Sequence, residues 1–419
     1  MYELNCDVAV IGAGPAGLAA ALAAREYGAA SVVLLDRDDR LGGILNQCIH
    51  PGFGLHHFGQ ELTGPEYARR FIEPLAQSDI QVFLETMVLQ IDSGPILYAI
   101  NPQQGLMAVK PKALILAMGC RERARGALAI PGTRPAGIYS AGTAQRLINL
   151  EGQMPGKQAV ILGSGDIGLI MARRMAYEGA KVEAVCELMP YSSGLPRNIA
   201  QCLDDLNIPL LLSHTVVEIH GQQRLEAVTI ARVDAALKPI SGTQKRIACD
   251  TLLLSVGLIP ENELSLEASL EMDSLTGGPL VDHTFATSQP GIYACGNGLH
   301  VHDLVDFVTK EAQLAGKQAA RFAQGLASPL PTLPCMPADR VAYVLPQRLS
   351  PCDETADLCF RVKAPMGASV FQAVQGDRVL AEKKKTVSTP GEMDTLPLPL
   401  STLQADGGPV MFRVLEVSS

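Results

Sequence analysis

The hydrophobic pattern begins with an apolar run over residues 7–11 that is typical of a buried strand. A turn with three spaced glycines follows, and an alanine-rich stretch then predicts a helix that reaches Tyr27. A second apolar strand over residues 31–35 ends at Asp36. The glycines of the turn are Gly12, Gly14 and Gly17. This order of strand, glycine turn, helix, strand and acid predicts a βαβ unit that binds a dinucleotide.

Each residue of this first fingerprint has a defined physical role. Gly12 permits the tight turn, Gly14 lets backbone amides approach a pyrophosphate, and Gly17 allows the helix to pack closely on the strand. The helix N-terminus stabilises the phosphate charge. The carboxylate of Asp36 is expected to accept a hydrogen bond from a ribose hydroxyl.

The same pattern recurs further along the chain. A strand is predicted over residues 157–162, a helix over 169–177 and a second strand over 181–186, closed by Glu187. An acid at this point accepts hydrogen bonds from a free 2′-hydroxyl and repels a 2′-phosphate, so NAD(H) is favoured over NADP(H). The glycines of this second fingerprint are Gly163, Gly165 and Gly168.

The C-terminal pattern is different. A Pro-rich segment over residues 329–335 predicts a linker, and residues 336–419 contain short alternating runs separated by Gly, Pro and Asp. These runs predict a small β-rich domain. They lie at 341–345, 358–362, 369–374, 378–383 and 411–415. The charges of Lys383–Lys385 fit either a solvated face or a docking patch for a partner.

Composition limits the classes of function. The 419 residues carry a net charge of -9 and no Trp, which excludes a basic surface for nucleic acid. The ten cysteines lack paired zinc-type spacing, so we expect reduced thiols, no metal site and a cytoplasmic protein. Acids precede the apolar run over residues 8–24, which is also too short to span a bilayer, so no membrane span is expected.

Three further segments carry a resemblance to a known family. Residues 287–298 read Thr-Ser-Gln-Pro-Gly-Ile-Tyr-Ala-Cys-Gly-Asn-Gly and precede a helical run over about 301–324. With residues 113–119 and 252–262, this segment resembles the two-dinucleotide-binding-domain flavoproteins of the pyridine nucleotide-disulfide oxidoreductase superfamily. The resemblance covers residues 1–328.

This resemblance implies an α/β fold with two Rossmann-like three-layer domains and a small C-terminal β-rich domain. An NAD(H)-binding domain over residues 122–279 would be inserted in an FAD-binding domain over 1–121 and 280–328. Asn297 stands where the family usually has Asp, so it brings a hydrogen bond to the ribityl chain but no charge. The implied FAD residues are Gly12, Gly14, Gly17, Asp36, Gly43, Gly119, Gly296 and Asn297, and those for NAD are Gly163, Gly165, Gly168 and Glu187.

The disulfide chemistry of the family is not expected here. The two dithiol positions of the family's L-G-G-x-C-x-N-x-x-C segment correspond to Leu45 and His50, and Cys48 lies in a different register. Cys48 could act alone as a sulfenate centre beside His50, or it could be a packing residue. A metal cluster of Cys48, His50, His56 and His57 lacks a tight pair spacing and is not favoured.

The segment before the long helix offers two interpretations. In the family this helix points its N-terminus at the flavin, where reduced flavin carries negative charge. His302 and Asp303 could cap the helix, or they could adjust the properties of the flavin together with His300. The catalytic candidates are therefore Cys48, His50 and His302.

Residues 42–50, 119–126 and 299–306 narrow the resemblance to flavoprotein subunits similar to those of opine oxidase, hydrogen cyanide synthase and amine dehydrogenases. Members commonly occur beside a glycerol-3-phosphate-type dehydrogenase. The resemblance implies electron transfer between NAD(H), FAD and a partner dehydrogenase, another electron-transfer protein or a small acceptor.

Three alternatives stay open. The first is a direct dehydrogenase of an amine, amino acid or opine-like substrate, with His50 or His302 as base. The second is a non-catalytic, nucleotide-bound assembly subunit, and the third is a thiol peroxidase that uses Cys48. The oligomeric state is also open.

Overall fold

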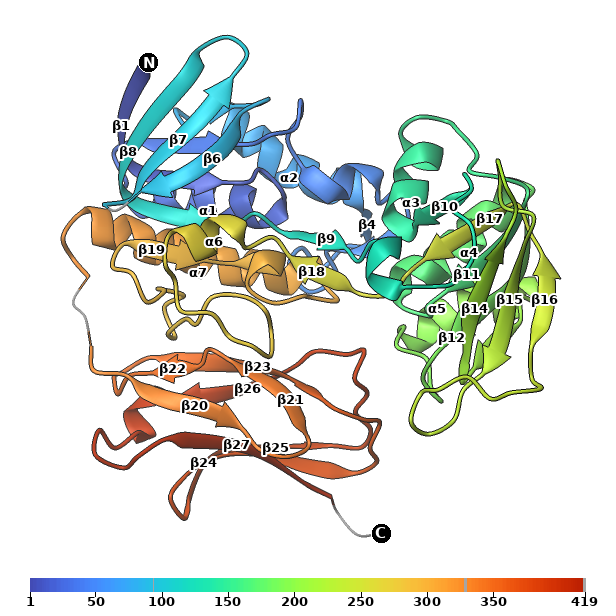
Figure 1. The fold of residues 1–419 in the computed structure, drawn as a ribbon. Coiled ribbons are helices and arrows are strands. Elements are labelled where there is room, and N and C mark those ends of the chain that lie inside the picture. The colour runs from blue at the N-terminus through green and yellow to red at the C-terminus, as the bar shows by residue number, and fades with distance from the viewer. Residues whose placement is uncertain (93, 328–329, 417–419) are drawn as a thin grey trace. The chain divides into compact units, whose positions relative to one another are not determined.

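The computed structural model describes residues 1–92, 94–327 and 330–416 (Figure 1). Residue 329 of the predicted linker and residues 417–419 of the predicted β-rich domain lie outside this part. The chain divides into two compact units, one of Met1–Cys120 with Pro260–Ser419 and one of Arg121–Ile259. The second fingerprint lies in the unit of Arg121–Ile259, which interrupts the chain of the unit that carries the first.

The first unit is built on one sheet in the order β5-β2-β1-β8-β7-β6, with β19 paired to β8. Strands β5, β2, β1, β8 and β19 run parallel, whereas β6, β7 and β8 form an antiparallel meander. The strands of the sheet are β1 (Tyr2–Ile11), β2 (Val32–Leu35), β5 (Gln81–Phe83), β6 (Met87–Asp92), β7 (Ile96–Asn101), β8 (Gly105–Leu116) and β19 (Ile292–Ala294). Short strands of this unit are β3 (Pro51–Phe53) and β4 (Leu62–Thr63), whereas the paired strands β9 (Cys120–Glu122) and β18 (Leu258–Pro260) cross the points where the chain passes from one unit to the other.

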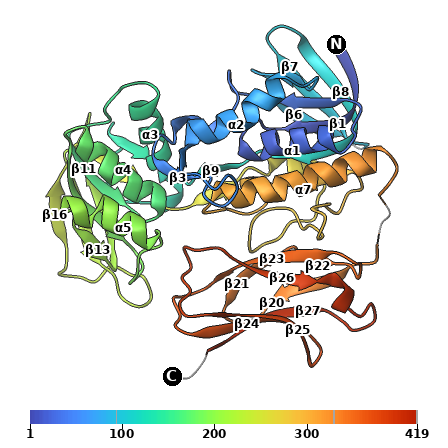
Figure 2. The same cartoon turned by 180° about the vertical axis from the view of Figure 1, so that it is seen from behind.

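The first and last helices of this unit, α1 and α7, lie side by side along the sheet (Figures 1 and 2). They are in such close contact that a side chain at Gly316 of α7 would overlap the backbone oxygen of Ala20 in α1. The helices of the unit are α1 (Pro15–Glu26), α2 (Gly64–Ala76), α6 (Glu263–Glu267) and α7 (Val305–Ala323). The alanine-rich faces of α1 and α7 therefore join the segment after residue 280 to the first fingerprint.

Residues 260–279 lie in the first unit, although the sequence assigns them to the NAD(H)-binding domain. The amide nitrogen of Asn262 donates to the backbone oxygens of Gly277 and Gly298, both at 2.8 Å. Leu270 is buried in the core of the first unit. These side-chain contacts fix the segment, and they join residues that are distant in sequence.

The second unit contains the parallel sheet β10-β17-β11-β12-β13 and the antiparallel sheet β14-β15-β16. Its strands are β10 (Ile138–Ser140), β11 (Gln158–Leu162), β12 (Lys181–Glu187), β13 (Leu210–Leu212), β14 (His214–His220), β15 (Ala227–Arg232), β16 (Lys245–Ala248) and β17 (Thr251–Leu254). Its helices are α3 (Ala141–Asn149), α4 (Asp166–Tyr177) and α5 (Pro196–Cys202). The parallel order is that of a doubly wound fold, with the fingerprint between β11 and α4.

The C-terminal residues form a separate core of two small sheets, β22-β20-β27-β24-β25 and β21-β23-β26 (Figure 2). The rings of Phe360, Phe371 and Phe412 fill it, with centroids 4.7 and 4.5 Å from Phe360. Its strands are β20 (Leu333–Pro337), β21 (Val341–Leu345), β22 (Arg348–Leu349), β23 (Thr355–Val362), β24 (Ser369–Gln375), β25 (Arg378–Lys385), β26 (Asp394–Pro399) and β27 (Val410–Glu416). The predicted β-rich domain is present, but residues 333–335 of the predicted linker belong to β20.

Among the described residues, no helix combines the length and the apolar character needed to cross a membrane.

Candidate functional site

The first fingerprint forms an open cradle at the start of α1. Gly12 has a φ of +102°, and a side chain there would overlap the backbone oxygen of Ala117. A side chain at Gly17 would overlap the backbone oxygen of Gly12, so α1 lies directly on the turn. A Cβ at Gly14, in contrast, would have no atom within 4 Å. The helix start also has no side-chain cap, so its N–H groups fit a pyrophosphate.

Asp36 is fixed beside this cradle at the end of β2. One of its carboxylate oxygens accepts a hydrogen bond from the Ala13 backbone N–H, and the other accepts one from Asp38 N at 2.7 Å. Gly43 lies over the cradle, because a Cβ there would come within 2.8 Å of the Gly14 Cα. The structure thus brings the predicted ribose-binding acid and Gly43 to the same edge of the sheet.

The segment after β19 returns to the same place. Its Gly296 has a φ of +73°, and a Cβ there would lie 2.7 Å from the Ala16 side chain. Gly298 lies against Gly119, and the Asn297 amide is 3.6 Å from the sulfur of Cys120. The sequence-predicted FAD residues therefore form two adjoining groups, one around Gly14 and one around Asn297.

A buried polar cluster underlies Asn297. Glu311 of α7 accepts a hydrogen bond from Gly296 N at 2.5 Å, and its other oxygen lies 2.9 Å from His300 Nε2 and 3.4 Å from His302 Nε2. Burial alone would raise the pKa of Glu311, but the two histidines lower it to about 2. Burial and the neighbouring His302 lower the pKa of His300 to about 4.

Sequence reasoning did not identify Glu311, although a signal for it exists. Buried positions of α7 recur at Val308, Ala312 and Ala315, and Glu311 falls on the same helical stripe. An acid at the spacing of these apolar positions indicates a buried partner, since a carboxylate is rarely buried without one.

The capping interpretation of Asp303 is wrong. Helix α7 begins at Val305, after an N-cap residue, Leu304, that makes no side-chain cap. Asp303 instead pairs with Arg361 of β23 at 2.8 Å and accepts hydrogen bonds from Met393 N at 3.2 and 3.3 Å. Because these donors come from the C-terminal strands and their loops, they bind its carboxylate away from the helix end.

The candidate cysteine and histidines before α2 make contacts other than those of this polar cluster. The Cys48 thiol donates to the backbone oxygen of Ile44 at 3.3 Å, and desolvation raises the pKa of the thiol to about 12. This shift disfavours the thiolate that a sulfenate centre requires. The His50 ring lies against Phe53, and the rings of His56 and His57 stack on Phe307 and Phe71.

The second fingerprint, in the other unit, repeats the backbone geometry. Gly163 has a φ of +99°, and a Cβ at Gly168 would lie 2.7 Å from the Gly163 oxygen. The nearest atom to a Cβ at Gly165 would be 3.6 Å away. Glu187 accepts hydrogen bonds from Ser164 N at 2.9 Å, Ser164 Oγ at 2.6 Å and Met189 N at 2.9 Å. This arrangement fits a second dinucleotide.

The second cradle has a carboxylate at its helix start, which the first lacks, and a loop is hydrogen-bonded to its turn. Asp166 occupies the first turn of α4, and its carboxylate accepts hydrogen bonds from Leu195 N at 2.8 Å and from the Asn198 amide at 2.7 Å. Ser192 Oγ also donates to the Ser164 oxygen at 3.2 Å. Residues 192–198 are therefore tied to the fingerprint turn.

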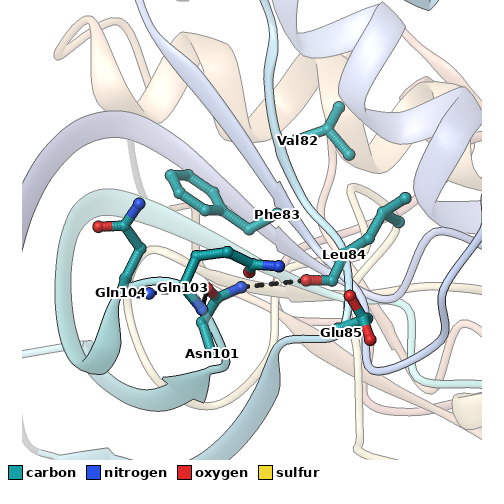
Figure 3. Close-up of a pocket in the computed structure, with 7 residues that line it drawn as sticks. All are labelled: Val82, Phe83, Leu84, Glu85, Asn101, Gln103 and Gln104. Carbon is teal, nitrogen blue, oxygen red and sulfur yellow. Dashed lines mark hydrogen bonds between the residues drawn. The ribbon is translucent and has the colours of Figure 1, made fainter.

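A hollow of about 460 Å³ lies beside β5 in the first unit (Figure 3). Asn101 faces it and donates from its amide to the Leu84 oxygen at 3.1 Å. The lining residues are Val82, Phe83, Leu84, Glu85, Asn101, Gln103 and Gln104. None of them is a predicted site residue, so we do not assign this hollow to the candidate site.

Comparison with known proteins identifies the class. The model of the family "Pyridine nucleotide-disulphide oxidoreductase" matches residues 6–319, and the chain belongs to this family. It is therefore a flavoprotein oxidoreductase with a Rossmann-type fold.

Two curated proteins of named function are similar to this chain. The chain is 27% identical over 322 residues to the hydrogen cyanide synthase subunit HcnB of Pseudomonas protegens, covering 70% of this chain and 66% of that protein. It is 26% identical over 345 residues to an opine oxidase subunit of Agrobacterium tumefaciens, covering 77% and 64%. The match thus spans about two thirds of the length of each relative.

Among solved structures, the thioredoxin reductase of T. acidophilum has a TM-score of 0.62 at 22% identity, and the match covers 77% of this chain and 99% of that one. This likeness shows the fold alone. The fold class predicted from the sequence is confirmed by the family and by this structure.

Proposed function

We propose that this protein binds FAD at the first fingerprint, exchanges hydride with NAD(H) held at the second, and passes the electrons to a partner protein or a small acceptor. The observation that carries the proposal is the duplicated cradle, in which Gly14 and Gly165 each leave space for a pyrophosphate. An acid, Asp36 or Glu187, is bonded to the backbone N–H beside each glycine turn.

FAD would supply the redox chemistry, and this chain would supply position and electrostatics. The N–H groups at the start of α1 would hold the pyrophosphate, and Asp36 the ribose. Asn297 would contact the ribityl chain. Glu187 would favour NAD(H), because its carboxylate repels the additional phosphate of NADP(H). No side chain needs to act as a nucleophile, which agrees with Leu45 and His50 at the dithiol positions.

An anaerobic titration of the purified protein tests the proposal. We expect a yellow protein whose visible absorption is bleached stoichiometrically by NADH and less readily by NADPH. The variant Gly165→Ala should keep the yellow colour but require more NADH, because the added Cβ enters the space for the pyrophosphate. A yellow protein that neither nucleotide bleaches would overturn the pyridine nucleotide part, and a colourless one the FAD part.

The similarity to an opine oxidase subunit favours a second candidate function, the direct oxidation of an opine. The same titration with octopine in place of NADH separates the two. Bleaching by octopine alone would favour the second candidate, whereas bleaching by NADH alone would favour the first.

A further inference from the structure

The hydrogen bonds around Glu311 determine where the protons of two buried histidines lie. The Tyr343 hydroxyl accepts a hydrogen bond from Arg361 Nε at 3.2 Å, so its own proton is available for His300 Nδ1 at 3.3 Å. His300 Nδ1 is then an acceptor, and Nε2 carries the proton that His300 donates to Glu311 at 2.9 Å. His300 is therefore neutral, which agrees with the lowered pKa of its ring.

His302 has the opposite arrangement. The Asn297 side-chain oxygen accepts a hydrogen bond from His302 N at 3.0 Å, and it also lies 3.2 Å from His302 Nδ1. His302 Nδ1 must therefore be a donor. The remaining nitrogen, Nε2, faces the Glu311 carboxylate at 3.4 Å. A bare lone pair there would repel the carboxylate, so a positive charge must lie between the two atoms.

We propose that His302 is held as a buried imidazolium, paired with Glu311 and bonded to Asn297, and that Tyr343 and Arg361 keep His300 neutral so that the charge resides on His302. The His302 and Glu311 side chains are 2% and 4% exposed, so water screens this pair little. The C-terminal domain is then part of the electrostatics of the flavin site, since Tyr343 and Arg361 both belong to it.

His302 acts as a positioning residue. It reaches the candidate flavin site through Asn297, and this part of the inference rests on the proposed function. The positive end of the His302–Glu311 pair is the end bonded to Asn297, and a positive charge on that side raises the midpoint potential of a bound flavin, because reduction adds negative charge. Other ionisable groups surround His302. They are His300, Asp303, Glu311, Cys295, Cys120, Tyr343, Cys359 and Arg361.

Nitrogen NMR of the holoprotein with ¹⁵N-labelled histidine tests the charge state. The chain has eight histidines, and His302→Asn assigns the resonances of interest while keeping an amide near Asn297. At about pH 7.5 we expect both nitrogens of His302 to carry protons and His300 to carry one, on Nε2. Tyr343→Phe should shift the Nδ1 resonance of His300. His214→Gln, in the second unit, should leave both histidines unchanged.

A His302 with a single proton would overturn the proposal. So would a stoichiometric metal in elemental analysis, because a metal ion at Nε2 would then supply the positive charge. Since His302→Asn leaves Glu311 buried without its partner, the double variant His302→Asn/Glu311→Gln provides a neutral pair that preserves the packing.

The midpoint potential of the bound flavin tests the second part of the proposal, the effect of the His302 charge on the flavin. We expect a lower potential in His302→Asn than in the wild type, and a value between them in the double variant. An unchanged potential in a protein that NADH still reduces would overturn only this part. A protein without flavin would overturn the proposed function, while the NMR result would still decide the charge of His302.

Discussion

The two glycine fingerprints share a backbone but differ in what surrounds it. In the first unit the helix after the turn starts with Pro15, and the glycine backbone of residues 42–43 lies over the cradle, where Gly42 N donates to the Ala13 oxygen at 2.9 Å. In the second unit the helix starts with Asp166, which is bonded to residues 195 and 198. A helix start without a carboxylate suits a dinucleotide that stays bound. A helix start that carries a carboxylate suits one that binds weakly and exchanges.

The largest effect is expected from a methyl group at the middle glycine of each cradle. Neither Gly14→Ala nor Gly165→Ala meets a close atom of the fold, and both residues have a negative φ. Both variants should therefore fold. Gly14→Ala should lose most of its FAD, and Gly165→Ala should keep FAD but raise the Kd for NADH by about tenfold or more.

Flavin content after purification and calorimetric titration with NADH measure the two effects. Gly17→Ala is the contrasting variant, because its Cβ would overlap the Gly12 oxygen, and it should be unstable as well as colourless. If Gly14→Ala retained its FAD, the first cradle would not be the FAD site.

Acid should affect the first unit through Glu311 and His300. The folded-state pKa of His300 is about 4 against an ordinary 6.5, so the unfolded chain binds the proton more readily between these values. Stability is therefore lost as the pH falls from 6.5 to 4. The pKa of Glu311, about 2 against 4.5, continues the loss at lower pH. Flavin release followed by fluorescence should increase across this range.

His300→Gln removes one of these titrations while keeping an amide donor for Glu311. Its flavin release should depend less on pH between 6.5 and 4. An identical pH profile in the wild type and this variant would show that acid acts on the site through other groups.

The sequence predicts the local parts of this molecule and misses those set by distant contacts. Both fingerprints and the five predicted C-terminal strands follow from short-range patterns, whereas the insertion is implied by the family resemblance; the fold class is confirmed. Of the two interpretations of Asp303, the helix cap is wrong because the partner of its carboxylate, Arg361, lies 58 residues further along the chain. The Pro-rich residues 333–335 form a strand because β20 pairs with β27, near the end of the chain.

The functional residues divide in the same way. The glycines and the two acids have sequence signals because spacing defines them, and the structure gathers those of each fingerprint at the start of α1 or α4. Their cofactors stay predictions. Glu311 required the fold, since its role depends on the return of α7 to Gly296 and on two histidines in the preceding loop.

The choice between the two nucleotides should depend on Glu187. The variant Glu187→Gln keeps a side-chain oxygen for Ser164 N but removes the negative charge. The preference for NADH over NADPH, measured as the ratio of reduction rates of the flavin, should fall by about fivefold or more, because one repulsive charge pair is removed. Asp36→Asn serves as the matched variant in the first unit and should leave this ratio unchanged. An unaltered preference in Glu187→Gln would mean that other residues select the nucleotide.

The smallest expected effect comes from the residue that distinguishes the two helix starts. Asp166→Asn keeps an oxygen for Leu195 N and removes a negative charge from the helix end that would receive the pyrophosphate. The helix end favours a negative charge by about 0.3–1 kcal/mol, and in the variant the pyrophosphate no longer shares this end with a carboxylate that repels it. The Kd for NADH should therefore decrease by about two- to fivefold, and more at low ionic strength than at high. Asn198→Ala, which loosens the tie but keeps the charge, should show a smaller change without this dependence on salt. Weaker NADH binding in Asp166→Asn would mean that the carboxylate contacts the nucleotide directly, and the contrast between a neutral and an acidic helix start would then have to be abandoned.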